Sequence, residues 1–521
     1  MSSILDSKQN QKRFHAAFLD GIRGIAALCV VYEHSQRTYK LSLPITTFYN
    51  SGYLGVRCFF VLSAFLLTFR SMLDWEQYHE NIEDEKHIDK NARNGGAFES
   101  KIDLEADLTD VPLLSSEKLN EISTKTKYNI FYKFLSYNQL KTWIKHQMAI
   151  KIWLKFFLRR FMRIYPPYAI LLPFIAYNNF LKRAYHQHVI PSTLASHLFL
   201  QRAEFTFWTI LAEMKYYLCI PIIVIGYVEL ARFGAYITNY LFRRPKIGAW
   251  TCRILCNIIL MIIRTNLLTS YKHYHDEYLQ TNAHIFMAGT ICSIWYREII
   301  RLGLLPLSSK EEKDLTSKSN NFNNFDGILH TNLSFMKRII KKLPSRYQLI
   351  RFFFDLGCYI TLFMILCTFP HLSEKILGLP RIRFELVLEN RFGGFLYAIL
   401  ILAGLLSRNG SFINACSCNF LRFCGRISFS IYLLHPIALT FVNEHLTWMG
   451  LNNTEDEFDK REKANNMFDA VIMSYFLTII LAWLYYNIVE KPSMNLANYI
   501  AKRWLNEVKL AKPDYKSVNH E

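Results

Sequence analysis

Two ionisable residues, Arg23 and His34, lie in the apolar stretch FLDGIRGIAALCVVYEHSQ, residues 18–36. Ionisable groups inside a membrane-spanning helix are costly unless they are solvated or paired, so they usually serve a function. Imidazole titrates near neutral pH, which makes His34 a candidate general base. On a helix the two residues lie about 16 Å apart along the axis. The alternative is that Arg23 extends its guanidinium to the membrane surface and that His34 marks the helix end.

Two arginines, Arg160 and Arg163, are three residues apart in RRFMRIYPPY and therefore share one helix face. Two guanidinium groups on one face suit the binding of phosphates. Pro166 and Pro167 follow and predict a distorted helix. The alternative is that both arginines are ordinary positive charges at the cytosolic end of a span.

A single carboxylate, Glu213, lies inside the apolar, aromatic-rich stretch FWTILAEMKYYLCIPII. A carboxylate in such surroundings needs a partner or a proton. We therefore expect Glu213 to act as an acid or base, or to orient the imidazole of His34.

Hydroxyl groups and a second histidine lie in two other apolar stretches. Ser428, Ser430 and His435 lie in ISFSIYLLHP, where Ser428 and His435 are seven residues apart and so share a helix face. Ser63 lies in GYLGVRCFFVLSAFLL, in which Gly55 is small enough to let a neighbouring helix approach closely. The alternative for the serines is a hydrogen bond to a preceding backbone carbonyl.

The elements that position these residues are expected to be membrane-spanning helices. Of the 521 residues 51% are hydrophobic and 15% aromatic, and the apolar residues come in long blocks. A span needs roughly 20 apolar residues, and we find about ten such blocks. The sequence thus predicts an all-α, polytopic membrane protein. The blocks centre on residues 18–36, 52–70, 164–181, 207–227, 250–268, 282–298, 352–370, 392–407, 428–446 and 468–488.

The formal net charge of +19 comes from basic residues that lie beside the predicted spans, so it indicates membrane topology and no nucleic-acid partner. We expect cytosolic tails over 1–17 and 494–521 around a transmembrane domain over 18–493. Two polar, low-complexity insertions are expected within it, at about 74–127 and 306–345. The cysteines are scattered and form no pattern typical of a disulfide framework or a metal site.

Six of these stretches, taken in order, resemble the acyltransferase 3 family of integral membrane O-acyltransferases. The similarity runs from residue 18 to about residue 493 and departs at Ala64, where the family usually has glycine. The motifs are the arginine and histidine separated by ten residues, GYLGVRCFFVLSAFLL, RRFMRIYPPY, FWTILAEMKYYL, ISFSIYLLHP and YYNIVEKPS.

The resemblance implies a helical bundle that moves an acyl group, acetyl or another short chain, from cytosolic acyl-CoA to a hydroxyl of a sugar or lipid. His34 matches the family's catalytic histidine, and Arg23 matches its paired basic residue. Arg160 and Arg163 match the pair implicated in binding the donor, and Glu213 matches the glutamate of span four. The other matching positions are Ser428, Ser430 and His435. Acetyl-CoA would be the donor substrate, with no metal required.

The mechanism expected from these matches has Arg160 and Arg163 holding the CoA phosphates while His34 deprotonates the acceptor hydroxyl from the outer side. Glu213 would fix the imidazole tautomer, and Arg23 would bind the donor or stabilise the oxyanion. An acyl-enzyme intermediate stays open. So do two other classes, a proton-coupled transporter and a non-catalytic receptor, although the blocks show no inverted repeat. Basic cytosolic loops fit the endoplasmic reticulum and the plasma membrane equally.

Overall fold

The computed structural model describes residues 2–39, 54–79, 148–270, 278–302, 344–366, 393–407, 410–448 and 459–504. Within these ranges all regular elements are helical and none is a strand. The first half contains α1 (Ser2–Tyr39), helices over Leu54–His79 and 148–177, α4 (Asn179–Ala184), α5 (Leu194–Leu198), the 3₁₀ turn η1 (Phe205–Phe207), α6 (Trp208–Phe242) and α7 (Pro245–Ser270). The second half contains α8 (Tyr278–Arg301), α11 (Pro344–Leu366), α13 (Gly393–Ser407), α14 (Ser411–Cys416), α15 (Asn419–Arg426), α16 (Ser428–Trp448), α17 (Asp459–Tyr485), the π-helical turn η5 (Tyr486–Glu490) and α18 (Lys491–Trp504).

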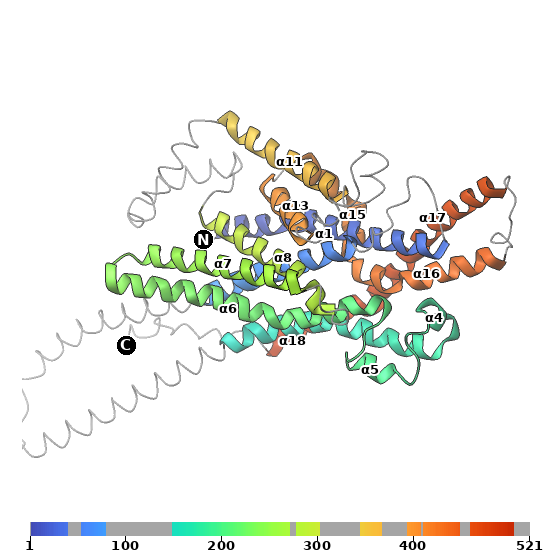
Figure 1. The fold of residues 1–521 in the computed structure, drawn as a ribbon. Coiled ribbons are helices and arrows are strands. Elements are labelled where there is room, and N and C mark those ends of the chain that lie inside the picture. Colours follow the sequence, from blue (N-terminus) through green and yellow to red (C-terminus); the bar gives the residue numbers. More distant parts are fainter. Residues whose placement is uncertain are drawn as a thin grey trace, which may run out of the picture.

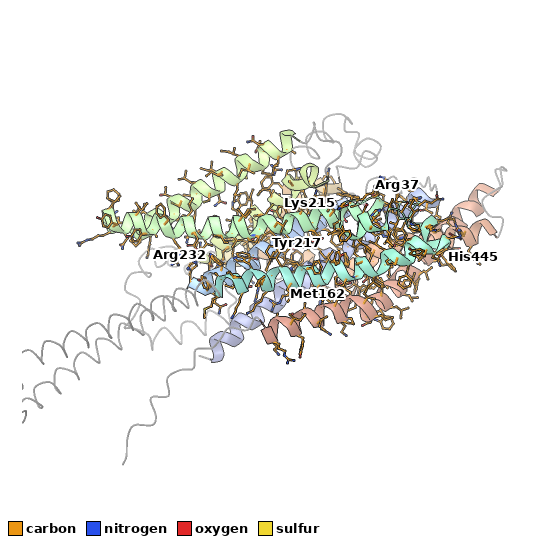
Figure 2. All side chains as sticks on the ribbon, turned by 90° about the horizontal axis from the view of Figure 1, so that it is seen from below. Arg37, Met162, Lys215, Tyr217, Arg232 and His445 are labelled. Atoms are coloured by element: carbon orange, nitrogen blue, oxygen red, sulfur yellow. The ribbon has the colours of Figure 1, made fainter. Side chains whose placement is uncertain are left out.

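The long helices lie side by side along one direction (Figure 1). Helix α1 packs against α15, α16 and α17, and α6 packs against α7 and α8. The short helices α4 and α5 lie at one end of the bundle, and the turn between α6 and α7 lies at the other. Figure 2 shows Arg37 and His445 near the first end, Arg232 near the second, and Tyr217 between them. With the N-terminus expected in the cytosol, we call the first end outer and the second inner.

Each of the ten predicted apolar blocks overlaps a helix. Four helices are long and apolar enough to cross a membrane, and α15 with α16, bent by 81°, makes a fifth candidate. The expected all-α membrane protein is therefore confirmed, whereas the number of ten spans stays a prediction. The four helices cover Leu54–His79, Phe205–Phe242, Pro245–Leu268 and Phe468–Arg503.

Two neighbouring segments pack closely against the backbone of α1 at glycine residues. The helix over Leu54–His79 crosses α1 at Gly55, where a Cβ atom would lie 2.4 Å from the carbonyl oxygen of Ala26. On another side of α1, a Cβ at Gly21 would lie 1.6 Å from the carbonyl oxygen of Cys416. Any side chain would push these backbones apart, so the expectation for Gly55 is confirmed. These contacts fix α1 within the bundle.

Most of both predicted polar insertions lies outside the described residues, so their bounds stay a prediction. Residues 74–79 continue the preceding helix, and residues 80–127 lie outside the described ranges. The second insertion lies outside them up to residue 343, and its last residues open α11. The expected C-terminal tail begins within α18.

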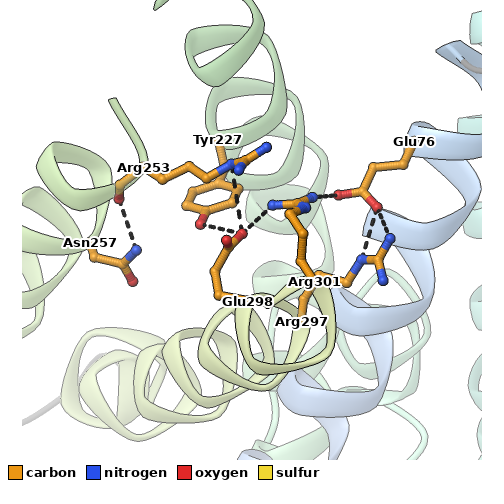
Figure 3. A network of polar contacts seen from close by, with 7 residues as sticks. All are labelled: Glu76, Tyr227, Arg253, Asn257, Arg297, Glu298 and Arg301. Carbon is orange, nitrogen blue, oxygen red and sulfur yellow. Dashed lines mark hydrogen bonds and ion pairs between the residues drawn. The ribbon is translucent and has the colours of Figure 1, made fainter. Parts of the chain in front are cut away.

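An ion-pair network ties the helix over Leu54–His79, α6 and α8 together at the inner end (Figure 3). Glu76 accepts two hydrogen bonds from Arg297, at 2.9 and 2.5 Å, and another from Arg301. Arg301 also bonds to Glu298, which accepts a hydrogen bond of 3.0 Å from the hydroxyl of Tyr227. These side chains are mostly buried, so each charge depends on its partners. The network holds the inner ends of the helices at a fixed spacing.

Candidate active site

His34 lies near the outer end of α1 and is half-buried. Its ring centroid is 4.8 Å from that of His435 on α16 and 5.7 Å from that of Phe205. Within the described part of the chain, the imidazole nitrogens of His34 have no hydrogen-bond partner. They are therefore available to a substrate, as a general base must be.

The tautomer of His435 is defined by a hydrogen bond to a backbone carbonyl of its own helix that lacks the usual N–H donor. Pro436 has no N–H, so the carbonyl of Tyr432 loses the donor that a helix would normally supply four residues later. The Nδ1 of His435 lies 2.8 Å from that carbonyl and donates in its place. A neutral imidazole that donates from Nδ1 carries its lone pair on Nε2. That Nε2 is buried and has no partner among the described residues, which leaves an unused acceptor beside His34.

The segment over residues 178–207 contacts His34 near the outer end of the bundle (Figure 1). Its Phe205 meets the ring of His34 and also the rings of His186, at 4.7 Å, and His188, at 6.0 Å. His188 is paired with Glu204 at 2.8 Å. Burial, followed by the nearby His188, lowers the pKa of His186. The aromatic contacts thus link the outer segment directly to His34.

Glu213 lies on α6, deeper in the bundle, and is held by two hydroxyl groups. Ser63 donates to its Oε1 at 2.5 Å, and the hydroxyl of Tyr217 donates to the same oxygen. From the sequence we expected Glu213 to act as an acid or base, or to orient the imidazole of His34. In the structure its hydrogen bonds go to Ser63 and Tyr217, and its charge interacts with Arg23 and Arg160.

The three predicted arginines form one group with Glu213. Arg23 pairs with Asp20 at 3.2 Å and interacts electrostatically with Arg163. Arg160 interacts with both Arg23 and Arg163. Three guanidinium groups on two helices thus converge in the inner half of the bundle, an arrangement whose charge and geometry suit an anion.

Glu490 is a member of this group that the sequence analysis missed. It is fully buried on the π-helical turn η5, and its Oε2 accepts a hydrogen bond of 2.7 Å from Ser430. Its Oε1 has no hydrogen bond within the described chain, and its charge interacts with Arg163 and Arg23. The available signal was an acid at the end of the last apolar block, in YYNIVEKPS.

The predicted site residues thus form two centres along the bundle. His34 and His435 make the outer centre, and Arg23, Arg160, Arg163, Glu213, Ser63, Ser430 and Glu490 make the inner one. Ser428 is buried at the start of α16. The described residues hold no group of three or more histidine, cysteine or acidic side chains that could bind a metal ion.

The model of the acyltransferase domain family, Acyl_transf_3, matches residues 147–487, more than half of the chain. The match begins after α1 and the helix over Leu54–His79, so His34, Arg23 and Ser63 lie before it, and Glu490 lies just beyond its end. No curated protein and no solved structure matches the chain.

Proposed function

This chain belongs to the acyltransferase 3 family, and from that premise we propose that it transfers an acyl group from cytosolic acyl-CoA to a hydroxyl group. The acyl group is acetyl or another short chain, and the acceptor is a sugar, a lipid or a related small molecule. The reaction takes place inside the bundle of a multi-pass membrane protein of the endoplasmic reticulum or plasma membrane, with both termini in the cytosol.

In this proposal the inner centre receives the donor. Arg160 and Arg163 contact phosphate groups of CoA, and Arg23 lies further along the route of the thioester. Glu213 and Glu490 offset part of the positive charge and hold the guanidinium groups in place. Without these carboxylates, the three arginines would repel one another in surroundings of low dielectric constant.

In this proposal His34 removes the proton from the acceptor hydroxyl. The hydroxyl oxygen then forms a bond to the thioester carbonyl carbon, the bond between that carbon and sulfur breaks, and CoA leaves as the thiol after taking a proton. His435 is a positioning residue: when the substrates bind, its Nε2, which has no partner among the described residues, accepts a hydrogen bond from the protonated ring nitrogen of His34 and so points the other ring nitrogen of His34 at the acceptor. The distance of 4.8 Å between the two rings supports this pairing.

The acceptor reaches His34 from the outer side in this proposal. The segment over 178–207 lies there and presents Phe205 and His186 next to the His34 ring. An aromatic ring beside imidazole groups suits a sugar ring or a lipid headgroup that carries hydroxyl groups.

The observation that supports the proposal most is the available imidazole of His34 next to the defined acceptor on His435, within a chain of this family. The test is transfer of radiolabelled acetyl-CoA, and then of longer acyl-CoAs, into the lipid and glycan fractions of membranes that contain the protein. The matched control is His34→Gln, which keeps a polar side chain of similar size but cannot act as a base. Label that depends on His34 would support acyl transfer.

Equal labelling with wild-type protein and His34→Gln, for all donors, would contradict the proposal. The result would then favour a proton-coupled transporter or a receptor on the same fold, because buried arginine, glutamate and histidine residues also occur in such proteins.

A further inference from the structure

A groove of about 450 Å³ lies between the start of the 148–177 helix and α18. Lys155 and Arg159 line one side, and Asn498, Tyr499 and Lys502 line the other. None of the described lining residues is acidic. Figure 1 shows α18 beside this helix in the inner part of the bundle. The groove thus presents three positive charges on the cytosolic side in the topology adopted above.

A row of basic residues on one helix connects the groove to the inner centre. Lys155, Arg159 and Arg163 follow each other at intervals of four residues and so form one row along the helix surface. Arg159 lines the groove, and Arg163, one turn further in, interacts with Glu490. An anion in the groove would therefore lie about one helical pitch, roughly 5 Å, from the arginines of the inner centre.

The groove also offers groups that suit a purine base. The side chain of Tyr499 is 54% exposed, so its ring is accessible for stacking. Arg503 lies 5.9 Å from the centre of that ring and donates a hydrogen bond to its hydroxyl, so a fourth positive charge lies beside Tyr499. The exposed amide of Asn498 can both donate and accept hydrogen bonds, as the edge of a base requires. A lipid phosphate would need the positive charges but neither the ring nor the amide.

We propose that this groove binds the adenosine 3′-phosphate end of acyl-CoA, with Lys155, Arg159 and Lys502 on its 3′-phosphate and Tyr499 on its adenine, while the pyrophosphate lies further in, on Arg163 and Arg160. The inference rests on the proposed function, because it assigns the far end of the same donor. A volume of about 450 Å³ lies within the usual range for small-molecule sites. The rest of the donor then extends from the groove past Arg163 into the bundle.

The test is direct binding to the purified full-length protein in detergent, with three probes: acetyl-CoA, 3′-dephospho-acetyl-CoA and adenosine 3′,5′-bisphosphate. Wild-type protein should bind acetyl-CoA about tenfold more tightly than the dephosphorylated form, since a contact between two charged groups is lost. Lys155→Ala with Lys502→Ala should abolish this preference and the binding of the bisphosphate. Arg244→Ala, which removes one charge from the exposed turn between α6 and α7, should change neither.

The single variant Lys502→Ala controls for misfolding of the double variant, because this exposed side chain can be removed without disturbing the core. It should reduce the preference for the 3′-phosphate severalfold. Equal binding of acetyl-CoA and its dephosphorylated form by wild-type protein would overturn the inference while leaving the proposed function intact. Failure of wild-type protein to bind acetyl-CoA at all would overturn both.

A lipid headgroup is the alternative ligand for this groove, and measurements in nanodiscs distinguish it from the nucleotide. The thermal stability of each variant is measured in phosphatidylcholine alone and with phosphatidylserine added. If the double variant lost a stabilisation by phosphatidylserine but bound all three nucleotides as wild-type protein does, the groove would be a lipid site and the inference would be wrong.

Discussion

Replacing His435 with phenylalanine removes the hydrogen bond that the structure shows for this residue and the contact with His34 that we propose for it. Phenylalanine fills the same buried space but has no nitrogen. The carbonyl of Tyr432 loses its donor, because Pro436 supplies none. A buried carbonyl without a partner costs about 1–3 kcal/mol of stability. The proposed hydrogen bond from His34 to Nε2 of His435 is lost as well.

The catalytic effect should be larger than the effect on folding. A positioned proton-transfer group contributes about 10²–10⁴-fold to the rate, and His435 acts one step removed from the proton. We therefore expect kcat to fall by about 100-fold, which corresponds to about 2.7 kcal/mol at the transition state. The KM for acyl-CoA should change less than about twofold, because the arginines of the inner centre lie roughly 16 Å away along α1.

The double variant His435→Phe with Pro436→Ala distinguishes structure from chemistry. Alanine at 436 restores a backbone N–H that can donate to the carbonyl of Tyr432, and it removes a proline from the helix interior. Stability should therefore return, as measured by the thermal melting of the purified protein, while kcat stays low. If the second substitution restored kcat together with stability, His435 would be a helix-stabilising residue only and the proposed pairing with His34 would be refuted.

Three further outcomes are expected. Glu490→Gln should raise the KM for acyl-CoA about tenfold while kcat changes little, in a steady-state assay, because the neutral amide no longer holds the guanidinium of Arg163 in place against the other arginines; a fall in kcat alone would contradict this. Glu76→Gln should lower the free energy of unfolding by about 2 kcal/mol, as measured by melting. This loss is smaller than that for a fully buried ion pair because the Glu76 side chain is 13% exposed. A double-mutant cycle with Arg297→Gln should show coupling between the two residues. Burial lowers the pKa of His186, so the unfolded segment binds more protons and the outer segment loses stability as the pH falls below about 6.5. Hydrogen exchange of the segment over 178–207, corrected for intrinsic rates, should therefore become faster below about pH 6.5 in wild-type protein but not in His186→Gln.

The helices were predictable because each apolar block is long enough to form one, and all ten overlap a helix. The pairing of helices was not, since the blocks carry no information about which faces meet. For this reason the sequence singled out Glu213 and Ser63 as separate candidates, but not the hydrogen bonds that join Glu213 to Ser63 and Tyr217. Glu490 was missed for a similar reason: at the end of a span an acid is ordinary, and only the fold shows that it is buried beside Ser430.

The contact between His34 and His435 joins residues about 400 positions apart and depends on how α1 and α16 cross. The sequence supplied both histidines as separate candidates. It also contained the reason for the His435 tautomer, since a histidine directly before proline lies close to the carbonyl that the proline leaves without a donor. That local rule could have been applied before the structure was known.

The two centres share helix α1, and this constrains how a donor can be used. Arg23 and His34 lie on one continuous helix that Gly21 and Gly55 hold tightly against its neighbours, so their separation of roughly 16 Å cannot close during the reaction. A donor bound by the arginines must therefore extend its reactive group to the histidine. Acyl-CoA fits this requirement, because its charged end and its thioester lie at opposite ends of a long flexible arm. A compact acyl donor that carried its phosphate next to the reacting carbonyl would reach one centre or the other, and we expect it to bind to the arginines without supporting transfer.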